Sequence, residues 1–376
     1  MSGFVKTLWI IGFVVCLAVT PLPAQKKKKS SDDEGLILPP VAKDKKKKKN
    51  ENVTQTLPPP LELPLAVVAE TDRLAFEVSP LSAKGLLSQQ TRDALKVLMR
   101  GNHGTVVKLR AFVAGSGDLR RVGEIAAEVF SEKHLPLPVL SVVQVGALPL
   151  EGAQVVIEST LVEKRSVNPN GVAFVSGQAG TGLDDALSKL KAVLQTGHLE
   201  LEDVLRTTCY ISSLDTENGV ANRLTEAFHS AAVNYVQTQR EPVGPAAECE
   251  AVARLHDPPA AMAVLGKGER YSQMALVHNP KLVITGTQLA FGSQANDIDL
   301  AFGRLQKMLA QFNSSLSATV MSHIYLMSPS MSEKFEADRA KFFSSETPPA
   351  STILPFEGLP SLDATLGLDV IAVAQN

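Results

Sequence analysis

Aromatic residues are scarce in this chain of 376 residues, at 5% of the sequence, and the single Trp, Trp9, lies near the N-terminus. Proteins that bind single-stranded nucleic acid stack its bases on aromatic side chains beside a basic groove, and the sequence has no such cluster. Much of the lysine lies in two runs, at 26–29 and 45–49, so the remainder is acidic although the formal net charge is −2. We therefore expect no specific nucleic-acid surface.

Cysteine is also rare, and its spacing excludes several kinds of site. The cysteines are Cys16, Cys209 and Cys249, without a Cys-x-x-Cys pair. If an N-terminal segment containing Cys16 is removed, two thiols remain, which do not make a disulfide framework. We expect them to be buried free thiols. The seven His residues lack metal-ligand spacing, and no phosphate loop or nucleophilic triad stands out, so no metal or cofactor is expected.

The N-terminus carries an apolar run at residues 8–19, preceded by Lys6 and followed by a Pro-Leu-Pro-Ala sequence at 21–24. This pattern is typical of a secretory signal peptide and predicts removal of residues 1–24 and export, periplasmic or secreted. Positive charge directly after the run opposes translocation. A membrane anchor formed by an uncleaved segment is therefore the alternative.

Residues 25–60 are rich in lysine and proline and poor in large apolar side chains. Such a segment buries too little apolar surface to offset the entropy of ordering, so we expect a disordered tether. Its lysine runs suit contact with an anionic membrane, a wall polymer or nucleic acid. A solvated spacer without a partner is the alternative.

From residue 61 onward, one pattern recurs three times, in predicted copies at 61–163, 164–258 and 259–376. Each copy reads as strand, helix, strand, helix and a closing pair of strands, with apolar residues at helical spacing in the helices. In the second copy we expect strands at 172–176, 204–212 and 248–253 and helices at 184–194 and 217–228.

A unit of this order forms one sheet with both helices on the same face. The other face must be covered, and three such sheets around a common axis would cover one another. We therefore expect an α+β fold of three sheet-and-two-helix units, with sheets inward and helices outward. The protein would be a monomer that acts as a pseudo-trimer.

Short motifs in the three copies resemble the RidA/YjgF family of reactive imine and enamine deaminases. They are VSGQ at 175–178, TGTQ at 285–288, YSQ at 271–273, LELEDV at 199–204 and the Leu148-Pro149 turn before VVIE at 155–158. The resemblance implies a chorismate-mutase-like trimer with ligand clefts between its units.

In that family, an Arg that opens the fifth strand grips the substrate carboxylate, and a Glu on the last strand positions the hydrolytic water. The resemblance places Leu140 and Ser351 at the Arg position of copies one and three, and Arg240 at that of copy two. The Glu position holds Glu158, Glu250 and Asp369. The implied catalytic pair is therefore Arg240 and Glu250.

The resemblance also implies ligand contacts in the clefts for several other residues. They are Tyr271, Ser176, Gly177, Asn222, Gly286 and Thr287. Each has a structural alternative. Tyr271 can pack at a copy boundary, Asn222 can make an interfacial hydrogen bond, and the glycines can serve turn geometry.

Two functions remain open. The loss of the Arg in two copies favours a non-catalytic protein whose degenerate clefts bind a small carboxylate metabolite or a partner protein. The retained pair, Arg240 and Glu250, supports the alternative, an imine or enamine deaminase that hydrolyses 2-imino acids in copy two. An imine is already electrophilic, so positioning by Arg and proton transfer by a carboxylate would suffice.

Overall fold

The computed structural model describes residues 61–375, apart from 102–103, 216–218, 242–245, 260–261, 279–280 and 293. The predicted signal peptide and tether lie outside the described residues. Within them, no helix has the length and apolar character needed to cross a membrane.

The first sheet contains four strands in the order β2-β5-β3-β4. Their bounds are β2 (Leu74–Val78), β3 (Thr105–Ala114), β4 (Val139–Val145) and β5 (Val155–Val162). β5 is antiparallel to β2 and β3, and β4 is parallel to β3. Helix α1 (Leu87–Gly101) connects β2 to β3, and α2 (Arg120–Glu132) connects β3 to β4.

The same strand order occurs twice more, within a 12-stranded sheet, as β6-β9-β7-β8 and β12-β16-β14-β15. The second group comprises β6 (Val172–Gly180), α3 (Leu183–Thr196), β7 (Val204–Ile211), α4 (Val220–Ala227), β8 (Ala232–Gln237) and β9 (Ala247–Arg254). The third comprises β12 (Leu282–Thr285), β13 (Gln288–Phe291), α5 (Ala295–Ala310), β14 (Thr319–Leu326), α6 (Pro329–Asp338), β15 (Ala350–Pro355) and β16 (Ala364–Val373). Both groups repeat the two antiparallel pairings and the parallel pairing of the first.

Short elements link these groups. β1 (Ala66–Ala69) pairs with β12, and β11 (Ser272–Val277) pairs with β6 and, through Ser272 and Ala350, with β15. β10 (Ala263–Lys267) forms a hairpin with β11. The 3-10 turns are η1 (Thr71–Arg73), η2 (Leu201–Asp203), η3 (Leu316–Ala318) and η4 (Arg339–Lys341).

The second group corrects one sequence prediction. The closing strands there were expected to begin near Arg240, whereas β8 spans Ala232–Gln237 and ends before it. The β8 segment gave no clear strand signal because the polar Asn234 interrupts it. Asn234 is buried because its side chain donates a hydrogen bond to Glu158 of the first group, 2.7 Å away, a contact that only the tertiary structure creates.

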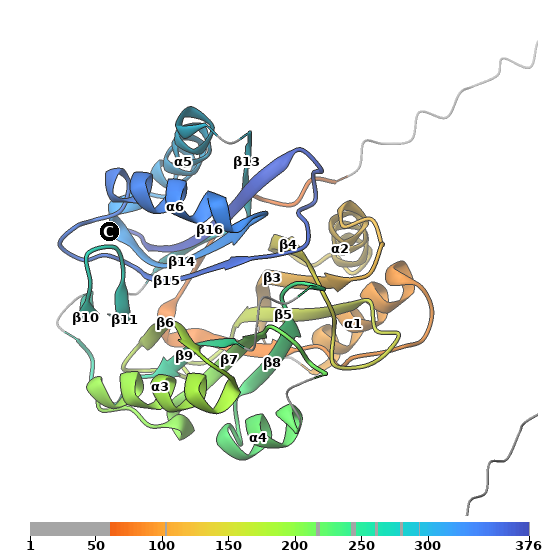
Figure 1. The fold of residues 1–376 in the computed structure, drawn as a ribbon, viewed down its shortest axis with the longest axis horizontal. Coiled ribbons are helices and arrows are strands. Elements are labelled where there is room, and N and C mark those ends of the chain that lie inside the picture. Colours follow the sequence, from red (N-terminus) through yellow and green to blue (C-terminus); the bar gives the residue numbers. More distant parts are fainter. Residues whose placement is uncertain are drawn as a thin grey trace, which may run out of the picture. The chain divides into compact units, whose positions relative to one another are not determined.

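Helical side chains enter three separate hydrophobic clusters, one per group. Figure 1 shows the corresponding pairs, α1 with α2, α3 with α4 and α5 with α6, at three places around the strands. Two further clusters, built from strands and loops alone, contain residues of all three groups. We call these the two shared clusters; Val107, Phe174 and Met321 belong to one, and Phe112, Tyr210 and Tyr325 to the other.

Strand β3 shows why the sequence is so apolar here. Every residue of β3 after Thr105 is buried, because one face packs on α1 and α2 and the other enters the shared clusters. A strand buried on both faces requires a nearly continuous apolar run. Lys108 and Arg110 break that run, and both point to the polar layer described below.

The two cysteines of the folded part form a disulfide, so the prediction of free thiols is wrong. Cys209 on β7 lies directly opposite Cys249 on β9, with Cα atoms 4.2 Å apart. The strand register brings the two thiols together, and that register cannot be read from a spacing of 40 residues.

Candidate functional site

One carboxylate from each group lies in a polar layer between the two shared clusters. Each stands on the last strand, opposite a polar residue of the central strand. The opposed pairs are Glu158 with Arg110, Glu250 with Thr208 and Asp369 with His323. We call these six residues, with Lys108, Arg206, Ser141, Asn234 and Tyr325, the central polar layer. None of the three carboxylate residues is more than 2% exposed.

Arg110 links the carboxylates of the first two groups. Its Nε lies 2.8 Å from Glu158, and its Nη2 lies 2.7 Å from Glu250 and 2.8 Å from the hydroxyl of Thr208. Arg206 donates a second hydrogen bond to Glu250 at 3.1 Å. Charge-assisted bonds of this length are strong, and they hold both carboxylates in fixed positions.

Asp369 of the third group has its own set of partners. Lys108 forms an ion pair with it, Ser141 and Tyr325 donate hydrogen bonds at 2.7 and 2.8 Å, and His323 Nδ1 lies 3.0 Å away. The other ring nitrogen of His323 lies 3.2 Å from Glu250. His323 therefore connects the third group to the second.

The charged side chains of the central polar layer shift the pKa values of its carboxyl groups. Burial raises the pKa of Glu250, but Arg110, His323 and Arg206 outweigh it and hold that pKa well below the usual range. Burial also raises the pKa of Asp369, and Lys108 and His323 reverse the effect. Both carboxylates are therefore ionised at neutral pH, and each is stabilised by a basic side chain of the first strand group, Arg110 for Glu250 and Lys108 for Asp369.

The structure does not bring the implied catalytic pair together. Glu250 is fully buried, and its described partners do not include Arg240. Arg240 is exposed, follows the end of β8, and donates its backbone N–H to Glu357 of the third group. The expectation that Arg240 opens a strand is wrong because β8 opens at Ala232. In the parallel register, Val233 occupies the place that Leu140 and Ser351 hold in the other groups.

Several predicted ligand residues do meet, at the junction of the second and third groups. The hydroxyl of Ser176 donates to the carbonyl of Ser272 and accepts the N–H of Ser351 at 2.8 Å. Tyr271 adjoins this contact, and its side chain is 43% exposed. The junction therefore combines the VSGQ motif, the YSQ motif and the third group's Arg position.

A buried arginine that the sequence analysis missed completes this junction. Arg339 is 0% exposed, and its Nη2 donates to the hydroxyl of Ser351 at 2.9 Å. Its guanidinium lies 5.9 Å from the ring centroid of Tyr271. Glu336 is 3.4 Å from Nη1, and Nε has no hydrogen-bond partner. Burial lowers the pKa of Arg339, and Glu336 partly opposes that effect.

Glu248 lies beside the glycine of the VSGQ motif. A Cβ on Gly177 would collide with this carboxyl group in its present position, so a larger residue there would displace the Glu248 side chain. The strand pairing of β6 with β9 shifts register between Val175 and Gln178, which places the motif at a bulge. Burial, together with the charge of Glu250, raises the pKa of Glu248 to about 8. This carboxyl group is therefore mostly protonated at neutral pH.

The remaining predicted ligand residues serve other contacts. Gly286 and Thr287 lie against the first group: a Cβ on Gly286 would be 2.8 Å from the carbonyl of Leu140, and Thr287 donates its N–H to that carbonyl at 3.2 Å. The backbone thus fills this junction. Asn222 is exposed on α4.

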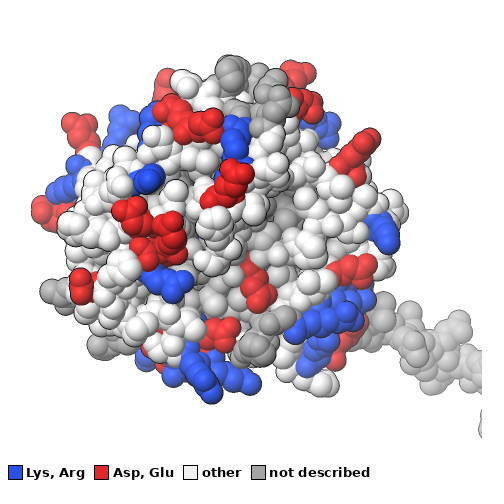
Figure 2. All heavy atoms as spheres, turned by 90° about the horizontal axis from the view of Figure 1, so that it is seen from below, with Lys and Arg blue, Asp and Glu red and all other residues white. Residues whose placement is uncertain are grey.

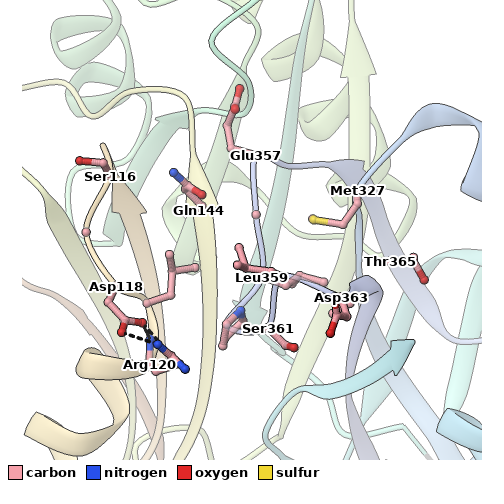
Figure 3. Close-up of a pocket in the computed structure, with 16 residues that line it drawn as sticks. Ser116, Asp118, Arg120, Gln144, Met327, Glu357, Leu359, Ser361, Asp363 and Thr365 are labelled. Atoms are coloured by element: carbon pink, nitrogen blue, oxygen red, sulfur yellow. Dashed lines mark hydrogen bonds and ion pairs between the residues drawn. The ribbon is translucent and has the colours of Figure 1, made fainter. Parts of the chain in front are cut away.

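A separate pocket of about 910 Å³ lies between the first and third groups. Figure 3 shows Asp118 and Arg120 on one side, paired with each other, and Ser361 and Asp363 on the other. Leu359 contributes apolar surface. The volume suits a small organic molecule, but none of the predicted site residues lines this pocket.

Two residues of the central polar layer that the sequence analysis missed could have been recognised from the sequence. Lys108 and Arg110 are charged residues inside an otherwise apolar strand, which indicates a buried polar role. Arg339 gave no such signal, because a basic residue near a helix end is ordinarily exposed.

Comparisons with known proteins add the following. No family model and no curated protein matches the chain. Among solved structures, it is similar to a YjgF-family protein from Neisseria meningitidis at 15% identity and a TM-score of 0.24. Yeast Mmf1 matches at 25% identity and a TM-score of 0.23, and a YjgF-family protein from Mycobacterium tuberculosis at 19% and 0.23.

The chain is similar to the YjgF family. These matches cover 31%, 31% and 30% of this chain and 96%, 100% and 100% of the matched structures.

Proposed function

We propose that this protein is a non-catalytic, three-unit relative of the YjgF family that binds a small carboxylate at the junction of its second and third units. The units are residues 61–163, 164–258 and 259–376, arranged as a trimer within one chain. The threefold strand order and the two shared clusters support this arrangement.

The central polar layer supports a non-catalytic role for the family's Glu position. A carboxylate that positions water needs space for that water, but Glu158, Glu250 and Asp369 are enclosed and bonded to side chains of neighbouring units. Glu158 accepts from Thr208 and Asn234, Glu250 pairs with Arg110, and Asp369 pairs with Lys108. Buried charges paired in this way fix the geometry of an interface. The three carboxylates therefore hold the units in register.

Arg339 is the observation that carries the carboxylate proposal. The guanidinium reaches the hydroxyl of Ser351, the residue at the third unit's Arg position. A guanidinium has five N–H donors, and among the described residues Arg339 donates one short hydrogen bond, to Ser351, and one long one, to Glu336. A ligand carboxylate would compensate this desolvated cation, and the partly exposed Tyr271 would cover it.

The test is calorimetric titration of the purified protein with a 2-oxo acid, using the corresponding amide as a ligand without charge. We expect Arg339→Gln to weaken binding of the acid at least tenfold. Arg240→Gln is the matched control, because it makes the same change at an exposed arginine whose described contact, through its backbone, is with Glu357 and not with the junction. Loss of binding in Arg240→Gln, with Arg339→Gln unchanged and folded by circular dichroism, would refute the proposal.

A second candidate, hydrolysis of 2-imino acids, rests on Glu248 instead of Glu250. A carboxyl group with a pKa of about 8 can donate a proton to a leaving amine at neutral pH. The assay is ammonia release from a 2-imino acid generated in situ. Activity that Glu248→Gln abolishes would support this candidate, and the absence of turnover in the unmodified protein would reject it.

Export of the protein is part of the proposal. The Cys209–Cys249 disulfide supports it, because disulfides persist in oxidising compartments. We propose that the Lys-rich segment serves as a tether to a membrane or wall polymer. The face in Figure 2 carries acidic and basic side chains interspersed, which favours no nucleic-acid partner for that face.

A further inference from the structure

An added strand covers the edge of the first strand in two of the three units. β1 pairs with β12, and β11 pairs with β6, both antiparallel. Each added strand lies near the start of its own unit and joins the sheet of another unit. The chain thus completes two sheet edges by strand addition across unit boundaries.

The corresponding edge in the first unit, along β2, has no such strand among the described residues. β2 pairs with β5 alone. The segment between β5 and β6 crosses only its start, where the side chain of Asn168 donates to the carbonyl of Leu74 at 2.7 Å. The rest of β2 is therefore only partly buried, whereas β12 and the first five residues of β6 are buried.

The hydrogen-bonding direction of β2 follows from its flanking contacts. Ser79 donates its N–H to Ile157 of β5 at 2.8 Å, and Glu163 donates to the carbonyl of Arg73 at 2.8 Å. In an antiparallel pair, alternate residues face the partner strand. The backbone groups of Phe76 and Val78 consequently point away from β5, toward the uncovered edge.

The far side of this edge resembles the junction that β11 fills. β11 lies between β6 and β15, the strand that is parallel to β14 in the third unit. The equivalent of β15 here is β8, which lies near β2. Among the described residues, β8 pairs with β7 and, at Gln237 alone, with Ala147. The β2 edge is therefore continuous with an interface that the chain builds elsewhere from its own strand.

We propose that the β2 edge binds an extended segment of a partner protein as an added strand beside β8. The two internal strands define the chemistry of this occupant. β1 has four residues, AVVA, and β11 has six, SQMALV, and neither carries a charge. Backbone bonds to Phe76 and Val78 set the register, and alternate apolar side chains of the occupant pack on the shared cluster that includes Phe76.

The probe is a fluorescently labelled peptide with the β11 sequence, Ser-Gln-Met-Ala-Leu-Val, titrated against the whole protein. We expect saturable binding and, in hydrogen exchange, at least tenfold slower exchange of the Phe76 and Val78 amides with peptide than without. Two peptides N-methylated on opposite alternate residues serve as matched controls. One blocks the groups that face β2 and should lose at least tenfold in affinity, and the other should retain binding.

A chain variant gives an independent readout. Val78→Pro removes one N–H that points away from β5 and leaves the hydrogen bonds to β5 in place, and proline is tolerated on edge strands. This variant should lower the affinity for the peptide at least tenfold. Equal loss with both methylated peptides, or unchanged exchange at Phe76 and Val78, would overturn the proposal. Amide protection that rises with protein concentration alone would also overturn it, because a second copy would then be the occupant.

Discussion

Removal of the Arg110 side chain tests whether the central polar layer holds the units together. In Arg110→Met, a side chain of similar length replaces the guanidinium that bonds Glu158 at 2.8 Å and Glu250 at 2.7 Å. Both carboxylates stay at most 2% exposed, so neither gains water in exchange. Leaving such buried charges without their partner costs about 3–5 kcal/mol in free energy of unfolding.

The pH dependence distinguishes this mechanism from a simple packing defect. In the unmodified protein the pKa of Glu250 is depressed, so its stabilising effect is complete at pH 5 to 7 and is lost only as the pH falls through that low value. In Arg110→Met, burial without the guanidinium raises the pKa of Glu250. Protonation then relieves the variant as the pH falls from 7 to 5, and its stability deficit shrinks.

The measurement is urea unfolding at pH 7 and pH 5, followed by circular dichroism. Arg120→Met is the matched control, since Arg120 pairs with Asp118 in an exposed position and its loss should leave the unfolding midpoint unchanged. The triple variant Arg110→Met, Glu158→Gln, Glu250→Gln should regain most of the lost stability at pH 7. A deficit below about 1 kcal/mol, or one that grows toward pH 5, would refute the reasoning.

Three further outcomes are expected. The folded pKa of Glu248, about 8, exceeds its unfolded value, so the free energy of unfolding falls as the pH rises from about 5 to 8. Glu248→Gln should remove this fall and raise the free energy of unfolding at pH 8 by about 1–2 kcal/mol, a modest gain because the side chain is partly exposed. An unchanged pH profile of stability would contradict this prediction. Reduction of the Cys209–Cys249 disulfide, or its replacement by two alanines, should lower the free energy of unfolding by about 2–4 kcal/mol, measured with and without dithiothreitol. Light scattering of residues 61–376 should give the mass of one chain, and a mass of three chains would contradict the proposed arrangement.

The sequence alone predicted the order of elements and their apolar faces. Helices such as α1 carry a periodic signal and strands such as β3 a nearly continuous apolar run, and both depend only on neighbours along the chain. Short motifs indicated the family resemblance. The position of β8 was missed, because Asn234 is buried only through its bond to Glu158 in another unit. Arg240 was consequently placed on a strand that it follows.

The chemistry of the interior was decided by the tertiary structure. Glu158, Glu250 and Asp369 were located correctly on their last strands. The sequence could not show that Arg110 joins the first two and that His323 joins the last two at a common centre. Arg339 reaches Ser351, and Cys209 reaches Cys249, only once strands far apart in the sequence are in register. Periodicity determines which face of an element is buried, whereas the identity of the buried partner depends on packing between elements.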